Sequence, residues 1–290
     1  MIVVDKPSGW TSHDVVGKLR GIAKDRRIGH LGTLDPSATG VLPCVLGRAT
    51  RLAQFHTRND KVYEGVIRFG FSTDSYDAQG EPTSEPREVS LSAEQAETLL
   101  AQFRGRILQK PPAISAKKID GQPAYKLARK NKPVDLEPVE VEIFELRITA
   151  VEGCDVSVYV RCSGGTYIRS IAHDAGQALG CGAHLTSLRR LASGDFRIAS
   201  SYTLEQLQRL SDEGRLQEAL IPAAQLLPEF PTEVVDEITE SQIRNGRTFR
   251  TSPFRTPPGT HHVKAVSQSG ELVAIGEAKL PHLFQPIIVF

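Results

Sequence analysis

Long hydrophobic runs are missing from this sequence of 290 residues. No stretch approaches the roughly 18 consecutive apolar residues that a membrane-spanning helix needs. The N-terminal residues MIVVDKPSGW carry an acid at Asp5 and lack the basic, apolar and small succession of a secretory signal. We therefore expect neither a membrane segment nor a secretory signal.

Cysteine is scarce as well. The four cysteines, Cys44, Cys154, Cys162 and Cys181, are widely separated, and no two of them form a C-x-x-C pair. This scatter argues against a zinc site, so we expect no metal. Scattered cysteines are also typical of a protein whose thiols stay reduced, and we expect the protein to be cytoplasmic.

Net charge is the third missing feature, because 35 basic residues nearly balance 34 acidic ones for a net charge of +1. This balance argues against a uniformly basic nucleic-acid-binding protein. The charges are segregated, however, since residues 104–132 contain nine basic residues and one acid, Asp120. A local basic patch is expected where a polyanion binds. The same run is compatible with a solvated helix face, and the charges alone leave both interpretations open.

Hydrophobic periodicity predicts helices and strands that do not alternate regularly. Helices are expected at 12–23, with Ser12 as a cap, and from about Ser92, Thr166 and the capping box at Thr203. Strands are expected at 62–69, 139–149, 156–162, 184–190 and 195–200. Residues 111–125 are rich in Pro and Gly, and a short helix is expected at about 125–130. We therefore predict an α+β fold with a large mixed or antiparallel sheet flanked by helices.

A proline-rich segment near the C-terminus suggests a domain boundary. Residues 221–233 contain three prolines and are expected to form a linker between two cores. Beyond them, one short helix and two or three strands fit into about 60 residues. We predict two domains, 1–228 and 229–290, of which the second is small, mostly β and barrel-like.

The segment 29–40, GHLGTLDPSATG, is the first candidate for a functional site and is expected to be a loop. Its three glycines permit close backbone approach to a ligand, and Asp35 precedes a proline that fixes a turn. An Asp-Pro pair alone is usually a turn element. The segment lacks the Gly-Lys-Ser/Thr of a P-loop, so it does not imply ATP.

Four stretches carry a family resemblance. They are DKPSGWTSHDVV (5–16), GHLGTLDPSATGVLP (29–43), ISAKKIDGQPAYKLAR (114–129) and CSGGTYIRSIAHDAGQALGCGAHLTSLRR (162–190). In this order they resemble the successive motifs of the TruB family of tRNA pseudouridine synthases, with Leu31 and Ala175 as minor departures. The C-terminal residues resemble the family's PUA-type RNA-binding domain more weakly. The resemblance implies the pseudouridine-synthase fold and isomerisation of uridine 55 in the T loop of tRNA.

The implied reaction breaks the N1–C1′ bond of uridine, turns the uracil and joins C5 to C1′. No atom is added and no electron is transferred, so we expect no cofactor. An ionised carboxylate must attack C1′ or assist loss of the 2′ proton, and the sequence leaves both routes open. The resemblance assigns this carboxylate to Asp35 and its cationic partner to Arg169. Without the motif, Arg169 is equally a surface arginine at the start of a helix.

The resemblance also implies which residues surround the base. Tyr63 matches the tyrosine that stacks on the flipped uracil, although a strand tyrosine is also typical of a core. His30 matches the histidine that fills the space vacated in the RNA. Tyr167 and Leu188 match further pocket residues. Lys6 opens the first motif and is expected to support the catalytic loop.

The basic segment matches a thumb-like insertion of the family, at 104–134, that closes on the RNA. We expect Lys117, Lys118 and Arg129 to contact phosphates without reading bases. The implied partner is the T stem-loop of tRNA, recognised largely by shape by a monomer without a guide RNA.

Three alternatives remain at this stage. The first is a non-catalytic RNA-binding protein, against which the joint presence of Asp35, Tyr63 and Arg169 argues. The second is a uridine methyltransferase that uses Cys44 or Cys162 as a nucleophile, which no methyl-donor glycine motif supports. The third is a guide-RNA-dependent relative, whose members usually carry additional N-terminal sequence.

Overall fold

A mixed nine-stranded sheet forms the centre of the computed structural model, which describes residues 1–56, 59–115, 117–119, 122–123 and 136–290. In spatial order its strands are β1 (Ile2–Lys6), β3 (Thr39–Leu46), β10 (Ala183–Ser193), β4 (Lys61–Phe69), β9 (Asp155–Cys162), β8 (Val139–Glu152) and β5 (Gly105–Gln109), with β2 (Ile28–His30) beside β3 and β11 (Phe196–Arg197) beside β10. Strands β3 and β10 pair in parallel, and the other described pairs of this sheet are antiparallel. The predicted α+β fold with a mixed sheet is confirmed.

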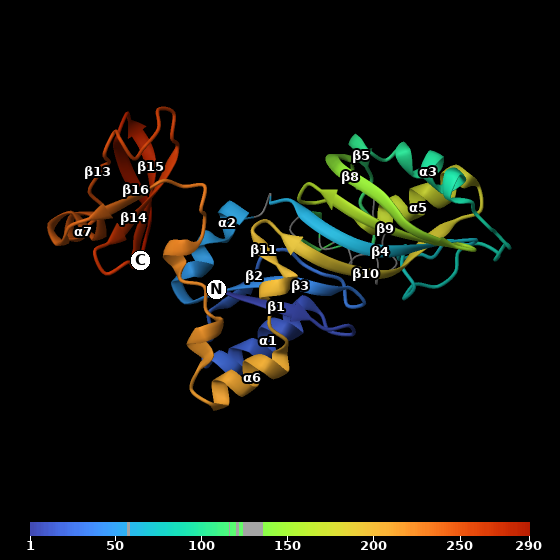
Figure 1. Cartoon of the computed structure of the whole chain (residues 1–290), viewed down its shortest axis with the longest axis horizontal. Coiled ribbons are helices and arrows are strands. Elements are labelled where there is room, and N and C mark those ends of the chain that lie inside the picture. Colours follow the sequence, from blue (N-terminus) through green and yellow to red (C-terminus); the bar gives the residue numbers. More distant parts are fainter. Residues whose placement is uncertain (57–58, 116, 120–121, 124–135) are drawn as a thin grey trace.

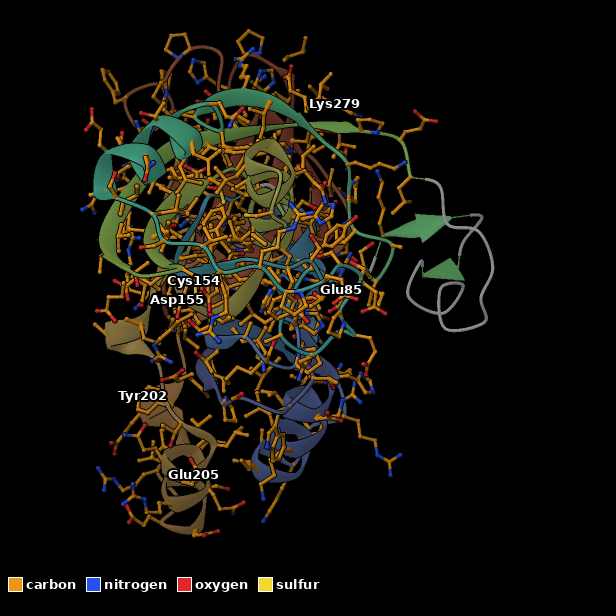
Figure 2. All side chains as sticks on the ribbon, turned by 90° about the vertical axis from the view of Figure 1, so that its right-hand side faces the viewer. Glu85, Cys154, Asp155, Tyr202, Glu205 and Lys279 are labelled. Atoms are coloured by element: carbon orange, nitrogen blue, oxygen red, sulfur yellow. The ribbon has the colours of Figure 1, made fainter. Side chains whose placement is uncertain are left out.

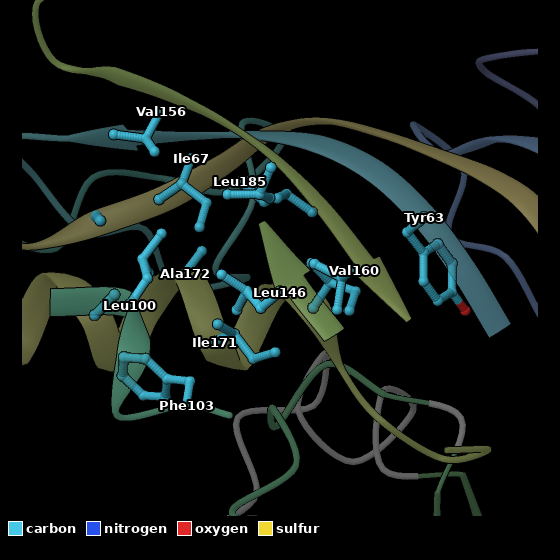
Figure 3. Close-up of a cluster of buried hydrophobic side chains, with 14 of the residues drawn as sticks. Tyr63, Ile67, Leu100, Phe103, Leu146, Val156, Val160, Ile171, Ala172 and Leu185 are labelled. Atoms are coloured by element: carbon cyan, nitrogen blue, oxygen red, sulfur yellow. The ribbon is translucent and has the colours of Figure 1, made fainter. Parts of the chain in front are cut away.

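Helices cover the sheet in two groups (Figure 1). Helices α3 (Ala93–Ala101) and α5 (Ile168–Leu179) pack on the half formed by β4, β8, β9 and β10. Their core includes Ile67, Leu100 and Ile171, all essentially inaccessible to solvent (Figure 3). Helices α1 (Ser12–Ala23) and α6 (Leu204–Asp212) pack together beneath β1 and form a separate apolar cluster. Among the described residues, no helix is both long enough and apolar enough to cross a membrane.

The predicted helix 12–23 is confirmed, but its cap is not Ser12. Thr11 caps the helix, because its hydroxyl accepts a hydrogen bond from the Asp14 backbone N–H at 3.1 Å in a reciprocal capping box. Ser12 is instead buried and bonds to the backbone of Leu34, 22 residues away. The predicted capping box at Thr203 is present, and the helix expected from about Ser92 also begins with a capping box, which was not predicted.

Two segments differ from the periodicity-based expectation. Gly29 and His30 belong to β2, and Thr39 and Gly40 begin β3, so the true loop is confined to residues 31–38. Three-residue strands such as β2 have no measurable period and are held by pairing with a neighbour, here Ile28 with Leu46. The expected strand 195–200 is also too long, because β11 ends at Arg197 and a 3₁₀ turn, Ile198–Ser200, follows.

The C-terminal region forms a second sheet of five strands. In spatial order these are β12 (Thr232–Val235), β14 (His262–Ser267), β15 (Leu272–Leu280), β16 (Leu283–Val289) and β13 (Phe249–Arg250), with helix α7 (Glu237–Arg244) against them. This sheet has its own core around Phe249, Val263 and Phe284. The predicted small, mostly β unit is therefore present.

The segment 221–233, expected to be a linker between two cores, is packed against both sheets. Leu226 and Leu227 are buried in one apolar cluster with Val41 and Leu52 of the N-terminal region and Ile275 of the C-terminal sheet. Lys264 of β14, itself buried, donates hydrogen bonds to the carbonyls of Ala224 and Leu226 at 3.0 and 3.1 Å. The two units therefore share a core, which the proline content did not reveal.

The basic segment expected as an insertion at 104–134 is described in part. Its first residues form β5 of the main sheet, so the insertion begins after Gln109. Strands β6 (Lys118–Ile119) and β7 (Gln122–Pro123) form a two-stranded hairpin that stands to one side of the main sheet (Figure 2). The helix expected at about 125–130 lies outside the described residues.

Candidate active site

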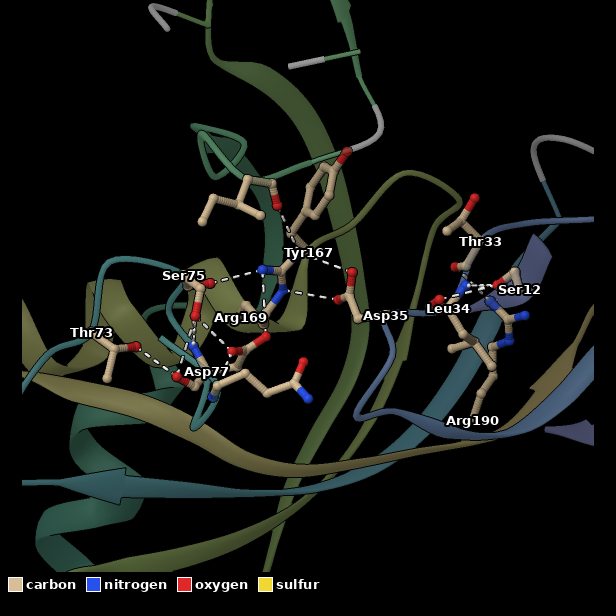
Figure 4. A network of polar contacts seen from close by, with 12 residues as sticks. Ser12, Thr33, Leu34, Asp35, Thr73, Ser75, Asp77, Tyr167, Arg169 and Arg190 are labelled. Carbon is tan, nitrogen blue, oxygen red and sulfur yellow. Dashed lines mark hydrogen bonds and ion pairs between the residues drawn. The ribbon is translucent and has the colours of Figure 1, made fainter. Parts of the chain in front are cut away.

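The loop that carries Asp35 is fixed from below by Arg190 of β10 (Figure 4). The Arg190 guanidinium is 1% exposed and donates from Nη2 to the Gly32 carbonyl at 2.9 Å and from Nη1 to the Thr33 carbonyl at 3.5 Å. Its Nε donates to the carbonyl of Val41 at 2.7 Å. Arg190 thus joins the loop to the sheet, a function that no local sequence pattern indicated.

Lys6 and Ser12 hold the same loop from the other side. The Lys6 ammonium is fully buried and donates to the Pro36 carbonyl at 3.1 Å, as well as to the carbonyls of Pro7 and Trp10. The Ser12 hydroxyl donates to the carbonyl of Leu34 and accepts from its N–H. The expected supporting role of Lys6 is confirmed by these contacts.

Gly40 permits the close approach of two strands rather than of a ligand. Its φ of +99° is unfavourable for a side chain, and a Cβ there would lie 2.2 Å from the Arg190 carbonyl oxygen. The glycine therefore allows β3 to lie against the residue that fixes the loop carrying Asp35.

Asp35 and Arg169, 134 residues apart in sequence, form an ion pair with two contacts. Arg169 Nε lies 2.9 Å from Asp35 Oδ2, and Nη2 donates to Oδ1 at 3.1 Å. Arg169 is in the first turn of α5, yet its side chain is 5% exposed, so the surface-arginine interpretation is wrong. The pairing that the family resemblance implied is present.

Arg169 is also held on the side away from Asp35 (Figure 4). It donates to the carbonyls of Ser75 and Ile114 at 2.8 and 3.0 Å, and its Nη1 lies 3.6 Å from Asp77 Oδ2. Asp77 in turn accepts from the Ser75 hydroxyl at 2.6 Å. Asp77 was not among the predicted site residues, because it lies far from Arg169 in sequence and approaches it only in the folded chain.

Burial raises the pKa of the Asp35 carboxyl above its ordinary value. The Arg169 guanidinium opposes this rise, the nearby Asp77 carboxylate reinforces it, and Lys6 opposes it from a greater distance. The side chain keeps 35% of its surface exposed, so it remains accessible from the adjoining pocket. Arg169 therefore favours the ionised form without fully offsetting the effect of burial on the pKa.

Asp35 opens into a pocket of about 570 Å³, a size typical of small-ligand sites. Of the predicted site residues, those that line it are Asp35, Tyr63, Lys117, Tyr167, Arg169 and Leu188. Lys61 and Arg190 line it as well and were not predicted. Residues from well-separated parts of the chain thus converge on one cavity.

Two tyrosines and a leucine provide its apolar walls. Tyr63 is 8% exposed on β4, at the margin of the main apolar core, and burial raises its pKa, which the Arg190 guanidinium opposes (Figure 3). Tyr167 precedes α5, and its backbone exchanges two hydrogen bonds with the Gln109 side chain at 2.8 and 3.0 Å. Leu188 is half-buried on β10. The core and pocket interpretations of Tyr63 are therefore both correct.

Other predicted residues lie elsewhere. His30 is half-buried in β2 and is not among the described lining residues of this pocket. Burial lowers the pKa of its imidazole, assisted by Arg190. Lys117, in contrast, lines the pocket, and its ammonium also donates to the carbonyl of Glu137 at 3.4 Å. The side chain of Lys118 and the whole of Arg129 lie outside the described residues.

The four cysteines are all unpaired. Burial raises the pKa of the Cys44 thiol to about 12 and that of Cys162 to about 11. A nucleophilic cysteine needs an accessible thiol with a lowered pKa, so both sites argue against the cysteine-based methyltransferase alternative. Within the described ranges, no three His, Cys, Asp or Glu side chains are placed to bind a metal ion.

Comparison with known proteins identifies the family. Residues 20–168 match the TruB family pseudouridylate synthase N-terminal domain, and residues 169–228 match the tRNA pseudouridylate synthase B C-terminal domain. The chain is 62% identical over 289 residues to tRNA pseudouridine synthase B of Solibacter usitatus (strain Ellin6076), covering 100% of this chain and 99% of the relative. It is 42% identical to tRNA pseudouridine synthase B of Stutzerimonas stutzeri (strain A1501), covering 96% and 90%.

A solved structure is similar in fold over the same extent. A chain of an H/ACA RNP bound to a substrate RNA containing 2′-deoxyuridine matches with a TM-score of 0.75 at 24% identity, over 100% of this chain and 84% of that one. The fold, the two family domains and the full-length identity agree, and this chain belongs to the TruB family of pseudouridylate synthases.

Proposed function

We propose that this enzyme converts uridine 55 in the T loop of tRNA to pseudouridine, with Asp35 as the catalytic carboxylate. The observation that carries the proposal is the Asp35–Arg169 ion pair at the edge of a 570 Å³ pocket lined by Tyr63. The names of the relatives, both tRNA pseudouridine synthase B, support tRNA as the substrate.

The chemistry requires a carboxylate that reaches the sugar. Asp35 either attacks C1′ to form a glycosyl ester or takes up the 2′ proton to form a glycal, and in both routes the N1–C1′ electron pair leaves with the uracil. C5 of the turned ring then bonds to C1′, which expels the Asp35 carboxylate from the ester or, in the glycal route, is accompanied by return of the proton to C2′. The C5 proton is then lost and N1 takes up a proton. Since product and substrate have the same atoms, no cofactor is required.

Access to C1′ requires the uridine to leave the T-loop stack. Tyr63 stacks on the extruded uracil, with Tyr167 and Leu188 as the remaining apolar contacts in the pocket. His30 lies outside the described pocket lining, which supports a role toward the RNA rather than toward the base.

The remaining RNA contacts come from two regions. The basic insertion that follows β5, with Lys117, Lys118 and Arg129, neutralises phosphates of the T stem-loop. The C-terminal residues 229–290 act as a PUA-like domain that extends the RNA-binding surface. The enzyme acts as a monomer without a guide RNA. Full-length similarity to a protein named tRNA pseudouridine synthase B supports this over assembly in an H/ACA RNP, in which the similar fold also occurs.

The test is nucleoside analysis of a T-arm hairpin after incubation with the purified enzyme, with chelator present and no methyl donor. We expect one uridine to become a nucleoside of identical mass and altered retention. A product heavier by about 14 Da, formed only when a donor is added, supports methylation instead and contradicts the proposal. A second hairpin in which the target uridine is replaced by cytidine identifies the modified position.

A further inference from the structure

Lys61 is a buried lysine of the pocket that the reaction scheme above does not use. It is 7% exposed, it begins β4, and it lines the same cavity as Asp35 and Tyr63. Lys61 and Tyr63 are two residues apart on one strand, so their side chains leave the same face of the sheet about 7 Å apart. An extended lysine side chain spans a comparable distance, and its ammonium therefore reaches the edge of a base that stacks on Tyr63.

The Lys61 ammonium has hydrogen-bonding capacity to spare. In the described part of the chain it donates to the Asn59 carbonyl, and no carboxylate oxygen lies within 4 Å of it. An ammonium has three N–H donors, so two remain for a ligand. Arg190, the other cation at this side of the pocket, instead directs its guanidinium to the carbonyls of Gly32, Thr33 and Val41.

The catalytic loop lies directly over Lys61. A Cβ on Gly32 would be 4.0 Å from Lys61 Cε and 3.6 Å from Arg190 Nη1, which is ordinary van der Waals contact, so the loop lies within contact distance of the lysine side chain. The cation is thus placed inside the pocket beside the loop that carries Asp35, yet in the described residues it is not neutralised by a carboxylate.

On the basis of the proposed function, we propose that Lys61 is a catalytic residue that stabilises the uracil anion formed when the N1–C1′ bond breaks. In that step the electron pair of the bond stays on the uracil. In one route C1′ then bonds to the Asp35 carboxylate. In the other, the carboxylate removes the proton from C2′ and a C1′–C2′ double bond forms. The negative charge spreads over N1 and the carbonyl oxygens. A fixed, poorly solvated cation beside those oxygens is worth more than one in water, because it needs no reorganisation during the reaction.

The charge state of Lys61 provides one readout. Burial and, to a smaller extent, Arg190 of β10 lower its pKa to about 8, against the opposing effects of Cys162 of β9 and the adjacent Asp60. Since the protonated form is required, the single-turnover rate constant should fall as the pH rises through about 8. Lys6 also has a pKa lowered to about 8, so substitution is needed to show which lysine causes the fall in rate at alkaline pH. Lys61→Arg keeps the cation but does not titrate in this range, and it should abolish the limb.

The leaving-group ability of the base provides the second readout. Fluorine at C5 stabilises a uracil anion. Cleavage of the N1–C1′ bond in a T-arm hairpin with 5-fluorouridine at the target position should therefore depend less on Lys61. We expect Lys61→Met to lower the single-turnover rate constant about 100-fold with uridine and about ten-fold or less with 5-fluorouridine, measured as loss of the target nucleoside. The affinity for RNA should stay within three-fold, because the lysine acts on the base.

Lys264→Met is the matched control, because it removes a buried lysine that also donates to backbone carbonyls but lies outside the pocket. Its rate constants with the two hairpins should change by equal factors, and thermal melting of all variants reports on folding. Two results would overturn the inference. One is that Lys61→Met lowers the single-turnover rate constant by equal factors with uridine and 5-fluorouridine. The other is a loss of RNA affinity with an unchanged rate constant. The latter identifies a phosphate contact. Because wild-type conversion of uridine is measured in parallel, a failure of the proposed function itself is seen separately.

Discussion

Replacing Arg169 by Lys tests how the proposed catalytic carboxylate, Asp35, is held. The guanidinium contacts four acceptors, the Asp35 and Asp77 carboxylates and the carbonyls of Ser75 and Ile114, at 2.8 to 3.6 Å. The ammonium of a lysine is a single point with three donors and cannot contact all four. Each buried acceptor left without a partner costs about 1–3 kcal/mol, so we expect the free energy of unfolding to fall by about 2 kcal/mol.

The same substitution should change the pH dependence of catalysis. The guanidinium lowers the pKa of Asp35 against the effect of burial, and a weaker contact lowers it less. The carboxylate therefore takes up a proton at a higher pH, and the acidic limb of kcat/KM moves upward. We expect kcat/KM to fall about 100-fold, since misplacement of a catalytic group has effects of this size, and to fall further below neutral pH.

Arg189→Lys is the control for this experiment. Arg189 also makes two contacts with a carboxylate, to Asp5 at 2.7 and 3.1 Å, but its side chain is 40% exposed. Exposed pairs contribute about 0–1 kcal/mol, so its stability and pH profile should stay near those of wild type. Urea denaturation and kcat/KM between pH 5 and 9 measure both variants. An Arg169→Lys enzyme with wild-type stability and a superimposable pH profile would refute the reasoning.

Three further predictions concern the fold and the RNA. Gly40→Ala should lower the free energy of unfolding by about 3 kcal/mol or more, because the new Cβ would lie 2.2 Å from the Arg190 carbonyl oxygen. The control Gly153→Ala, at φ +61° in open space, should lower it by about 1 kcal/mol, and equal losses in denaturant titrations would contradict the close approach of the strands at Gly40. Deleting residues 229–290 should lower the melting temperature, since it uncovers the shared cluster around Leu226; a truncated protein that melts like the full chain would show that the two cores are independent. Four basic residues of the insertion can be replaced by Ala together, namely Lys117, Lys118, Arg129 and Lys130. The slope of log affinity for RNA against log salt concentration should then decrease in magnitude by roughly 0.7 to 0.9 for each phosphate that is no longer neutralised. An unchanged slope would mean that these residues form a solvated face without RNA contacts.

The sequence predicted the regular elements of the main sheet well, because their signals are local. Strand β4 was expected at 62–69 and runs from Lys61 to Phe69, since alternating apolar residues mark a half-buried strand directly. The helix at Leu204–Asp212 was marked by its capping box at Thr203. Strand β2 was missed because three residues carry no period. The packing of 221–233 was missed because its prolines break regular structure whether or not the segment is buried.

The candidate site was predictable where a motif carried it and not where distant residues meet. Asp35 and Arg169 were identified from the resemblance, and their contact followed. Arg190 and Asp77 act through hydrogen bonds and ion pairs with residues far from them in sequence, so no local pattern marks them. Lys61 did leave a signal, because its spacing in β4 predicts that it shares a strand face with Tyr63, but that both line one pocket is evident only from the structure.

The most direct test of the central claim follows the hydrogen on C5. A T-arm hairpin carrying tritium at C5 of the target uridine should release the label to water in the presence of the wild-type enzyme, because C5 exchanges its bond to hydrogen for a bond to C1′. Asp35→Asn at saturating concentration should release less than about one per cent of the wild-type amount while binding the hairpin within a few-fold of wild type. Release by Asp35→Asn at a rate comparable to wild type would contradict the assignment of Asp35 as the catalytic carboxylate.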